Sequence, residues 1–401
     1  MLLSFSVENY RCFKDKVTLS MKATADKRHP QNLSMFDFEN IKVLKTAGLY
    51  GSNASGKTTI VGAMHLMREF VIRSNSYNQN QIFSHTPFAF DSECLSKPTS
   101  FEMEFINNGV RFIYGFSYLS DGISEEHLYT YPNRKKKVIF ERDGLEFKFH
   151  SDVKLRSDIS KRMDSKKLYL SFASQFNDPE CKAAVEWFSN KLLPMVDYNV
   201  DQSLDILFSM IQNDLGFREH ILRALKIADF GITDLSDTPQ LINVNSSAMP
   251  IKLHNYMVQH TVAGTNTPLP LIAESKGTIR FLAVIGPVID ALTRGTTIVI
   301  DEMDLSFHTD LSKWIVGLFN DPEENRKNAQ LIFNTHDAEL LDQSVVRRDQ
   351  IWIVSRDYNT SASSLMNLRE LNIRNDLDIR KAYLNGSLGG TPFIEPERLM
   401  E

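Results

Sequence analysis

The chain has few cysteines, no long apolar run and no excess of basic residues. Its three cysteines, Cys12, Cys94 and Cys181, have no metal-ligand spacing and are expected to stay reduced. No apolar stretch approaches the roughly 20 residues that span a bilayer, and no basic leader precedes an apolar run at the N-terminus. The formal net charge of −5 argues against a globally basic nucleic-acid binder. We therefore expect a cytoplasmic protein with no membrane partner.

Internal repeats and sustained heptads are also missing, which argues against a solenoid and against a long coiled coil. The composition, 42% hydrophobic and 24% charged, is typical of a globular chain with a sizeable core. Period-two alternation over residues 101–150, with an Asn-Asn-Gly turn at 107–109, predicts an antiparallel β meander. The segment 151–255 loses this alternation, and its helical stretches at 183–193 and 204–228 predict a helical insertion.

The two ends of the chain alternate between strands and helices, which predicts an α/β fold with a mixed sheet. Three parts are expected: an N-terminal lobe over 1–150, a helical lobe over 151–255 and a C-terminal lobe over 256–401. The predicted elements outside the meander and the helical lobe are strands at 2–7, 17–21, 43–50, 296–300, 330–334 and 351–354, and helices at 58–74 and 277–292.

A glycine-rich loop follows the strand predicted at 43–50. Gly51-Ser-Asn-Ala-Ser-Gly56-Lys57-Thr58 matches the pattern G-x-x-x-x-G-K-[ST] and opens a predicted helix. The two glycines let backbone N–H groups point at phosphate oxygens, and the start of the helix adds a positive dipole end. Lys57 is predicted to reach the β- and γ-phosphates of ATP, and the Thr58 hydroxyl to bind Mg²⁺. The predicted cradle comprises Gly51, Ser52, Asn53, Ala54, Ser55, Gly56, Lys57, Thr58 and Thr59.

Two carboxylates end the strand predicted at 296–300. Asp301 is expected to hold Mg²⁺ beside Thr58, and Glu302 to orient or deprotonate the attacking water. An acidic turn at a strand end is the structural alternative. The phosphate loop favours the functional interpretation, because the two motifs together complete one phosphoryl-transfer site.

Three further motifs occur in a fixed order along the chain. Glu274-Ser-Lys-Gly-Thr278 opens the helix predicted at 277–292, Met303-Asp-Leu-Ser-Phe-His308 follows Glu302, and Thr335-His336-Asp337 ends the strand at 330–334. In this order they resemble the signature loop, D-loop and switch histidine of ABC-type ATPases of the RecF, SMC and OLD branch. The N-terminal Val7-Glu-Asn-Tyr-Arg11-Cys-Phe13 resembles the first strand of the same heads.

The resemblance implies specific roles for these residues. Ser275 and Gly277 would hold the γ-phosphate of ATP bound to a second copy, so a homodimer or higher homo-oligomer is expected. His336 would contact the γ-phosphate or the attacking water as a catalytic residue, and Arg11 would lie near the nucleotide. The alternatives are a plain helix cap for Ser275, a structural histidine, and an arginine paired with an acidic neighbour. Asp304 and His308 would cross the dimer interface, or else lie in a surface loop.

Overall the chain resembles the stand-alone ATPases of prokaryotic defence and abortive-infection operons, the RloA/AbiL-like group. The tail Tyr383-Leu-Asn-Gly-Ser-Leu-Gly-Gly-Thr-Pro392 is similar to the closing motif of that group. One departure is that no convincing Q-loop glutamine is present; Gln81 and Glu93 are the candidates. The stretch after His336 is too short for a nuclease domain, so a separate effector, a nuclease or toxin, is the expected partner.

Direct binding of DNA or RNA remains an alternative. The basic runs at 134–137 and 161–167 have the composition of phosphate-contacting segments, although such runs are more often solvated hairpin tips or helix faces. The leading hypothesis is an ATP-hydrolysing switch that dimerises around ATP and controls an effector in anti-phage defence. A RecF-like DNA-repair ATPase is the second hypothesis, and a scaffold that holds ATP without turnover is the third.

Overall fold

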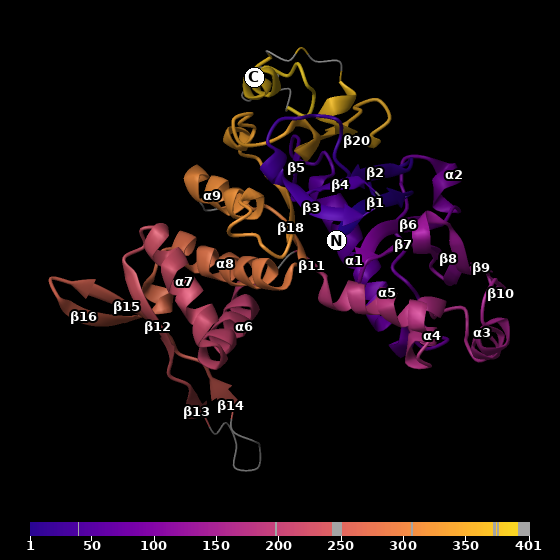
Figure 1. Cartoon of the computed structure of the whole chain (residues 1–401), viewed down its shortest axis with the longest axis horizontal. Helices are drawn as coiled ribbons and strands as arrows, with labels where there is room; N and C mark the ends of the chain where they lie inside the picture. Colours follow the sequence, from indigo (N-terminus) through magenta and orange to yellow (C-terminus); the bar gives the residue numbers. More distant parts are fainter. Residues whose placement is uncertain are drawn as a thin grey trace, which may run out of the picture.

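The computed structural model describes residues 1–38, 40–196, 199–242, 251–305, 308–371, 374 and 377–391. Two large sheets lie at its centre and right in Figure 1, and a helical lobe with projecting hairpins extends to the left. No helix in these ranges combines the length and apolar character that crossing a bilayer requires.

The predicted meander is an antiparallel sheet of order β10-β9-β8-β7-β6-β1-β2. Asn108 and Gly109 both have positive φ in the turn between β6 and β7, as a tight two-residue hairpin requires. The first two strands of the chain thus extend the meander rather than the second sheet. The strands are β1 (Leu2–Glu8), β2 (Val17–Ser20), β6 (Thr99–Asn107), β7 (Val110–Leu119), β8 (Gly122–Thr130), β9 (Lys137–Asp143) and β10 (Glu146–Phe149).

The second sheet has the order β11-β17-β18-β5-β19-β20 and is parallel except at β20. Its central strands are apolar on both faces: Ile298 and Ile300 of β17 face one core, and Val299 faces the other. The parallel strands therefore end at one shared edge. The strands are β5 (Thr46–Tyr50), β11 (Leu192–Met195), β17 (Thr297–Ile300), β18 (Gln330–Asn334), β19 (Ile351–Arg356) and β20 (Ser363–Asn367).

Helices cover both faces of the second sheet. α1, α4 and α5 belong to the core shared with the meander, whereas α6 to α10 belong to the other core. The helices predicted at 58–74, 183–193, 204–228 and 277–292 are confirmed within a few residues, although Asp214 divides the third into α6 and α7. The main helices are α1 (Lys57–Arg73), α3 (Val153–Ser160), α4 (Tyr169–Gln175), α5 (Pro179–Asn190), α6 (Val200–Asn213), α7 (Leu215–Ile227), α8 (Lys276–Arg294), α9 (Thr309–Asn320) and α10 (Ile379–Leu384).

The segment 43–50 is two strands rather than one. Lys45 separates β4 (Ile41–Leu44), which pairs with β3 (Leu33–Phe38), from β5, which enters the parallel sheet. The Lys45 N–H donates to Asn32 and its carbonyl accepts from Leu331, so the backbone changes partner at this residue. An uninterrupted apolar run cannot reveal such a change, because it depends on contacts distant in sequence.

The segment 151–255, predicted as a helical insertion, contains α3 to α7 and also several strands. β11 is an edge strand of the parallel sheet, paired with β17, and β12 (Ile232–Asp237) pairs with β15 (Tyr256–Val262). A further hairpin, β13 (Gln240–Ile242) with β14 (Ile251–Leu253), projects from the lobe, as does β16 (Thr265–Pro270) beside β15 (Figure 1). β11 is too short to show a period, and its Pro194 is tolerated because the strand lies at an edge. The three-part division of the chain remains a prediction.

Candidate functional site

The glycine-rich loop joins β5 to α1 at the carboxyl edge of the parallel sheet. A Cβ atom on Gly51 would lie 2.3 Å from the Val354 carbonyl oxygen, and one on Gly56 2.7 Å from the Cys12 sulfur. Gly56 also has a φ of 114°, which suits only glycine. Among the described residues, the buried Ser55 hydroxyl has no hydrogen-bond partner. The loop thus has the tight backbone and the free donor that an anion cradle needs.

Lys57 folds back over this loop. Its ammonium group donates to the carbonyl of Gly51 at 2.7 Å and to that of Ser52 at 3.0 Å. Burial lowers the pKa of Lys57 to about 8, and the nearby carboxylates of Asp304, Asp301 and Glu302 oppose this shift. The lysine and the carboxylates of the acidic turn are therefore close enough to interact within one site.

We expect ATP affinity to depend on pH through Lys57. Its ammonium form predominates below pH 8, and bound phosphates would raise its pKa, so ATP binding should take up a proton at higher pH. The Kd for ATP should change little near pH 7 and should rise about tenfold per pH unit above pH 8. Calorimetry in buffers of different ionisation enthalpy would measure both quantities. Constant affinity to about pH 9.5 would contradict the prediction.

The acidic turn lies beside the loop, as predicted. The Thr58 hydroxyl donates to Asp301 Oδ1 at 3.1 Å. Thr58 is exposed and Asp301 is buried, so the pair formed by the Thr58 hydroxyl and the Asp301 carboxylate is open to solvent on the threonine side. A hydroxyl and a carboxylate suit Mg²⁺, which keeps several waters and binds phosphate oxygens. Among the described residues, no group of three or more His, Cys, Asp or Glu side chains is placed to hold a metal ion.

Asn334 is a site residue that the sequence did not reveal. It ends β18, which lies between β5 and β17 in the sheet. Its side-chain amide donates to Asp301 Oδ1, and its side-chain oxygen accepts the backbone N–H of Glu302. One buried amide therefore orients both predicted acidic residues. The available signal was a polar residue directly after the apolar run 331–333.

Glu302 has an unusual backbone conformation. Its φ is 50°, a left-handed value that costs a non-glycine residue roughly 1–2 kcal/mol. The Arg280 guanidinium of α8 donates to the Glu302 carbonyl at 3.0 Å. The Glu302 side chain is exposed. Backbone strain held by several contacts is common at functional sites, and here it turns a carboxylate outward.

His336 lies at the same sheet edge as the acidic turn. Its backbone N–H donates to the Asp304 carboxylate at 3.2 and 3.3 Å, which links the loop after β18 to the loop after β17. His336 is exposed, and His308 caps the start of α9 by accepting from Asp310. Ser306 and Phe307 of the predicted D-loop fall outside the described residues. The roles of these histidines remain predictions.

Ser275 caps the start of α8. Its hydroxyl accepts from the Thr278 N–H at 3.1 Å, which is the structural alternative named above. Ser275 is nevertheless exposed, Gly277 is half-buried, and Glu274 pairs with His260 at 2.8 Å. Between described residues, no hydrogen bond or ion pair joins 274–278 to the phosphate loop of the same chain.

Arg11 is adjacent in sequence to a residue that contacts the cradle. It is exposed, and its guanidinium lies 5.3 Å from the centre of the Tyr10 ring. Cys12, the next residue, lies against Gly56. The Q-loop candidates are engaged elsewhere: Gln81 donates to Ile82, and Glu93 pairs with Lys97. No Q-loop residue is assigned.

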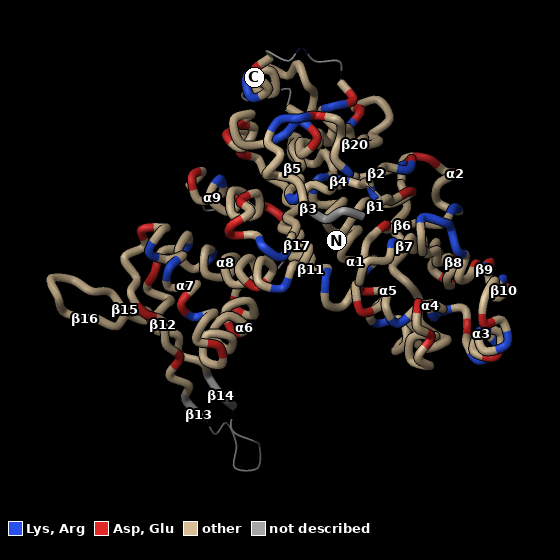
Figure 2. Tube along the Cα trace, viewed as in Figure 1, with Lys and Arg blue, Asp and Glu red and all other residues tan. Residues whose placement is uncertain are grey.

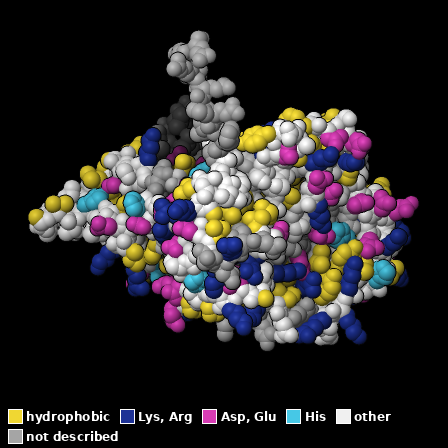
Figure 3. Space-filling view, turned by 90° about the horizontal axis from the view of Figure 1, so that it is seen from above, with side chains coloured by type: hydrophobic (Ala, Val, Ile, Leu, Met, Phe, Trp, Pro, Cys, Tyr) yellow, Lys and Arg dark blue, Asp and Glu magenta, His cyan; other side chains and the backbone are white. Residues whose placement is uncertain are grey.

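The basic runs lie on the meander and its neighbouring helices, around β8 and β9 in Figure 2. Several of their side chains have protein partners: Lys137 pairs with Glu180, Lys136 lies over the Tyr129 ring, and Lys167 pairs with Asp164. Lys166 is buried and donates to the Asp121 carbonyl. Figure 3 shows the basic and acidic side chains mixed over the face that it draws. These contacts favour a structural explanation of the runs.

A comparison with protein families identifies the family of the chain. Residues 47–342, more than half of the chain, match the family model described as "AAA domain, putative AbiEii toxin, Type IV TA system". The chain belongs to this AAA domain family. The matched region of this AAA protein contains the phosphate loop, the acidic turn and His336, and it marks the chain as an ATPase-family protein.

Other comparisons add little detail. Among solved structures, the SMC head domain from Thermotoga maritima is similar, with 12% identity and a TM-score of 0.41 over 91% of this chain and 98% of that chain. A search of curated proteins found no match.

Proposed function

We propose that this AAA protein binds MgATP between two copies of the chain and hydrolyses it. The observation that carries the proposal is the separation of two sets of residues that could contact phosphates. The cradle with Lys57 and Thr58 is at one sheet edge, whereas the exposed Ser275 at the start of α8 makes no bond to that cradle. A second copy that faces the first with its Ser275 would complete the site.

Each residue would have a distinct task in this dimer. Backbone N–H groups of residues 51–58 and the Lys57 ammonium would hold the β- and γ-phosphates, with Arg11 at the nucleotide's edge. Mg²⁺ would be held by Thr58 and Asp301, and it would neutralise charge that develops on the phosphates. Glu302 would accept the proton of the attacking water, and His336 would contact the γ-phosphate. Asn334 would keep the Asp301 carboxylate and the Glu302 backbone in place.

The control of an effector is the proposed biological role. The family description names a toxin and a toxin–antitoxin system, which supports a defence context without identifying the partner. The bound and separated states of the dimer would present different surfaces of the helical lobe and tail to a nuclease or toxin. A DNA-repair ATPase is the alternative; it predicts hydrolysis that DNA stimulates and binding with a steep salt dependence.

The test is phosphate release by the purified protein with MgATP, compared with its Ser275→Arg variant. The substitution removes the hydroxyl that would contact the γ-phosphate of the ATP bound to a second copy, so hydrolysis should fall at least roughly 100-fold while ATP binding remains. Ser209→Arg, at an exposed position of α6 in the same lobe, is the matched control. Full turnover by the Ser275→Arg variant would refute the shared site, and absence of turnover by the wild type would favour the scaffold.

A further inference from the structure

The tail that follows β20 packs directly against the phosphate loop. Tyr383 of α10 is buried, its ring centre lies 6.3 Å from that of Tyr50, and its hydroxyl donates to the Gly390 carbonyl at 3.4 Å. Burial raises the pKa of Tyr383, and a hydrogen bond with the Gly51 backbone partly offsets this shift. The buried phenol thus connects the tail to the residue just after β5.

Gly390 makes a second contact with the loop. Its φ is 73°, and a Cβ atom there would lie 2.9 Å from Ile353 Cγ2 and 3.3 Å from Gly51 Cα. A Cβ atom on Gly51 itself would lie 2.3 Å from the Val354 carbonyl oxygen. Gly51 is therefore packed closely against both β19 and the tail. Since the Gly51 carbonyl accepts from Lys57, the position of the tail also fixes the lysine.

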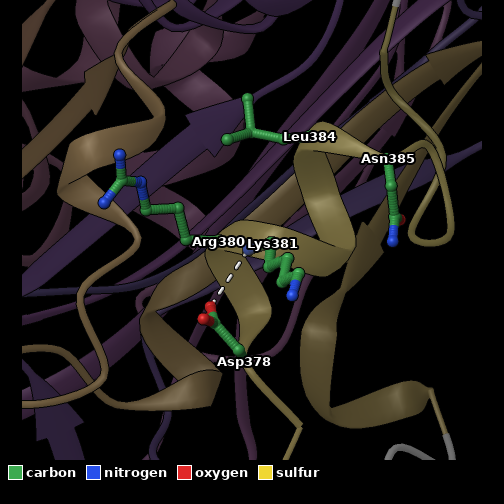
Figure 4. Close-up of a pocket in the computed structure, with 5 residues that line it drawn as sticks. All are labelled: Asp378, Arg380, Lys381, Leu384 and Asn385. Atoms are coloured by element: carbon green, nitrogen blue, oxygen red, sulfur yellow. Dashed lines mark hydrogen bonds between the residues drawn. The ribbon is translucent and has the colours of Figure 1, made fainter.

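The same tail also contacts the loop that carries His336. Arg380 of α10 pairs with Glu339, and Glu339 lies in the short helix that begins directly after Asp337. Figure 4 shows the Arg380 side chain directed away from Lys381, while Asp378 caps the helix by accepting from the Lys381 N–H at 3.0 Å. One short helix thus bridges the loops that follow β5 and β18.

Open space on the outer side keeps this bridge accessible. A pocket of about 560 Å³ lies between Ser52 of the phosphate loop and the glycine turn of the tail. Arg356 lines it from the end of β19, the exposed Tyr358 from the loop that follows, and Asn385 from the end of α10. A second pocket of about 410 Å³ borders α10 at Arg380 and Leu384 (Figure 4). A ligand or partner at either pocket would touch the bridge.

We propose that the tail Ile379–Thr391 is a positioning element of the nucleotide site, which ties the Gly51 end of the cradle to the His336 loop. This proposal rests on the proposed function, and it adds a way in which ATP binding could be regulated. ATP binding should tighten the tail, and by linkage anything that displaces the tail should weaken ATP binding by the same factor. The contact of Tyr383 and Gly390 with Gly51 should affect ATP binding. The contact of Arg380 with the His336 loop should affect turnover.

Three variants test these separate effects. Tyr383→Phe removes the hydroxyl contacts and should raise the Kd for MgATP roughly three- to tenfold with little change in kcat. Gly390→Ala should raise it at least about tenfold, because its methyl group would crowd Ile353 and Gly51 and displace the tail from the loop. Gly144→Ala, at a positive φ with open space around it, is the matched control. Arg380→Gln should lower kcat about three- to tenfold at unchanged Kd, with the exposed Arg369→Gln as its control.

Hydrogen exchange separates positioning from a merely structural role. In the wild type, MgATP should slow exchange of the amides of residues 383–391, and in Lys57→Ala it should not. The tail proposal alone is overturned if the wild type binds ATP, MgATP does not slow exchange in its tail, and the variants keep the Kd and kcat of the wild type. If the wild type binds no ATP, tail exchange will not respond, and both the proposed function and the tail proposal fail.

Discussion

Lys57→Ala is expected to abolish measurable ATP binding. The Lys57 ammonium group is buried within the cradle, where it donates to the carbonyls of Gly51 and Ser52. Alanine cannot replace its positive charge or its donors. Loss of a charged contact to phosphate in a partly desolvated site should weaken binding by at least about 100-fold. Calorimetric titration with MgATP measures the effect.

The control for this variant is Lys182→Ala, which removes an exposed lysine of α5 and should leave affinity unchanged. Both variants should retain the unfolding temperature of the wild type without nucleotide within a few degrees, because Lys57 makes its bonds within one loop. Only the wild type and Lys182→Ala should be stabilised by added MgATP. Near-normal affinity of Lys57→Ala for MgATP would show that Lys57 does not contribute to ATP binding.

Glu302→Gln is expected to stop hydrolysis while preserving binding. Glutamine keeps the shape of the side chain and the backbone contacts to Asn334 and Arg280, but it cannot accept the proton of the attacking water. The kcat should fall roughly 10²- to 10⁴-fold, as for the loss of a general base. Because hydrolysis is proposed to separate the copies, the variant should accumulate as a closed dimer with MgATP.

Single-turnover hydrolysis and light scattering after size exclusion measure the two effects. Glu323→Gln, at an exposed carboxylate in the loop after α9, is the matched control and should behave as the wild type. Normal turnover by Glu302→Gln would exclude it as the base. A low kcat without a dimer would retain the base but contradict the link between ATP and assembly.

The phosphate loop and the acidic turn were predictable because each is a local pattern. A strand, a loop with fixed glycine spacing and a helix start follow one another in the chain, and the structure has them at 46–73. Thr58 and Asp301 are far apart in sequence, yet their meeting was predicted, because parallel strands deliver their carboxyl ends to one edge.

The residues that were missed depend on contacts between distant segments. Asn334 gains its role only because β18 lies between β5 and β17. β11 is recognisable as a strand only through its pairing with β17. The tail motif that contains Tyr383 and Gly390 was noted in the sequence, but its contact with Gly51, far from it in the chain, was not predicted. Short elements and isolated polar residues carry too little periodicity for their partners to be inferred.

Complementation between two inactive variants tests the shared nucleotide site most directly. Lys57→Ala lacks a working cradle, and Ser275→Arg lacks a working cap, so each alone should be inactive. In a mixed dimer, the cradle of the Ser275→Arg copy faces the intact Ser275 of the Lys57→Ala copy. Random mixing in equal amounts should therefore restore about a quarter of the wild-type phosphate release. Activity that stays at the level of the separate variants, although mixed dimers form, would contradict a nucleotide held between two copies.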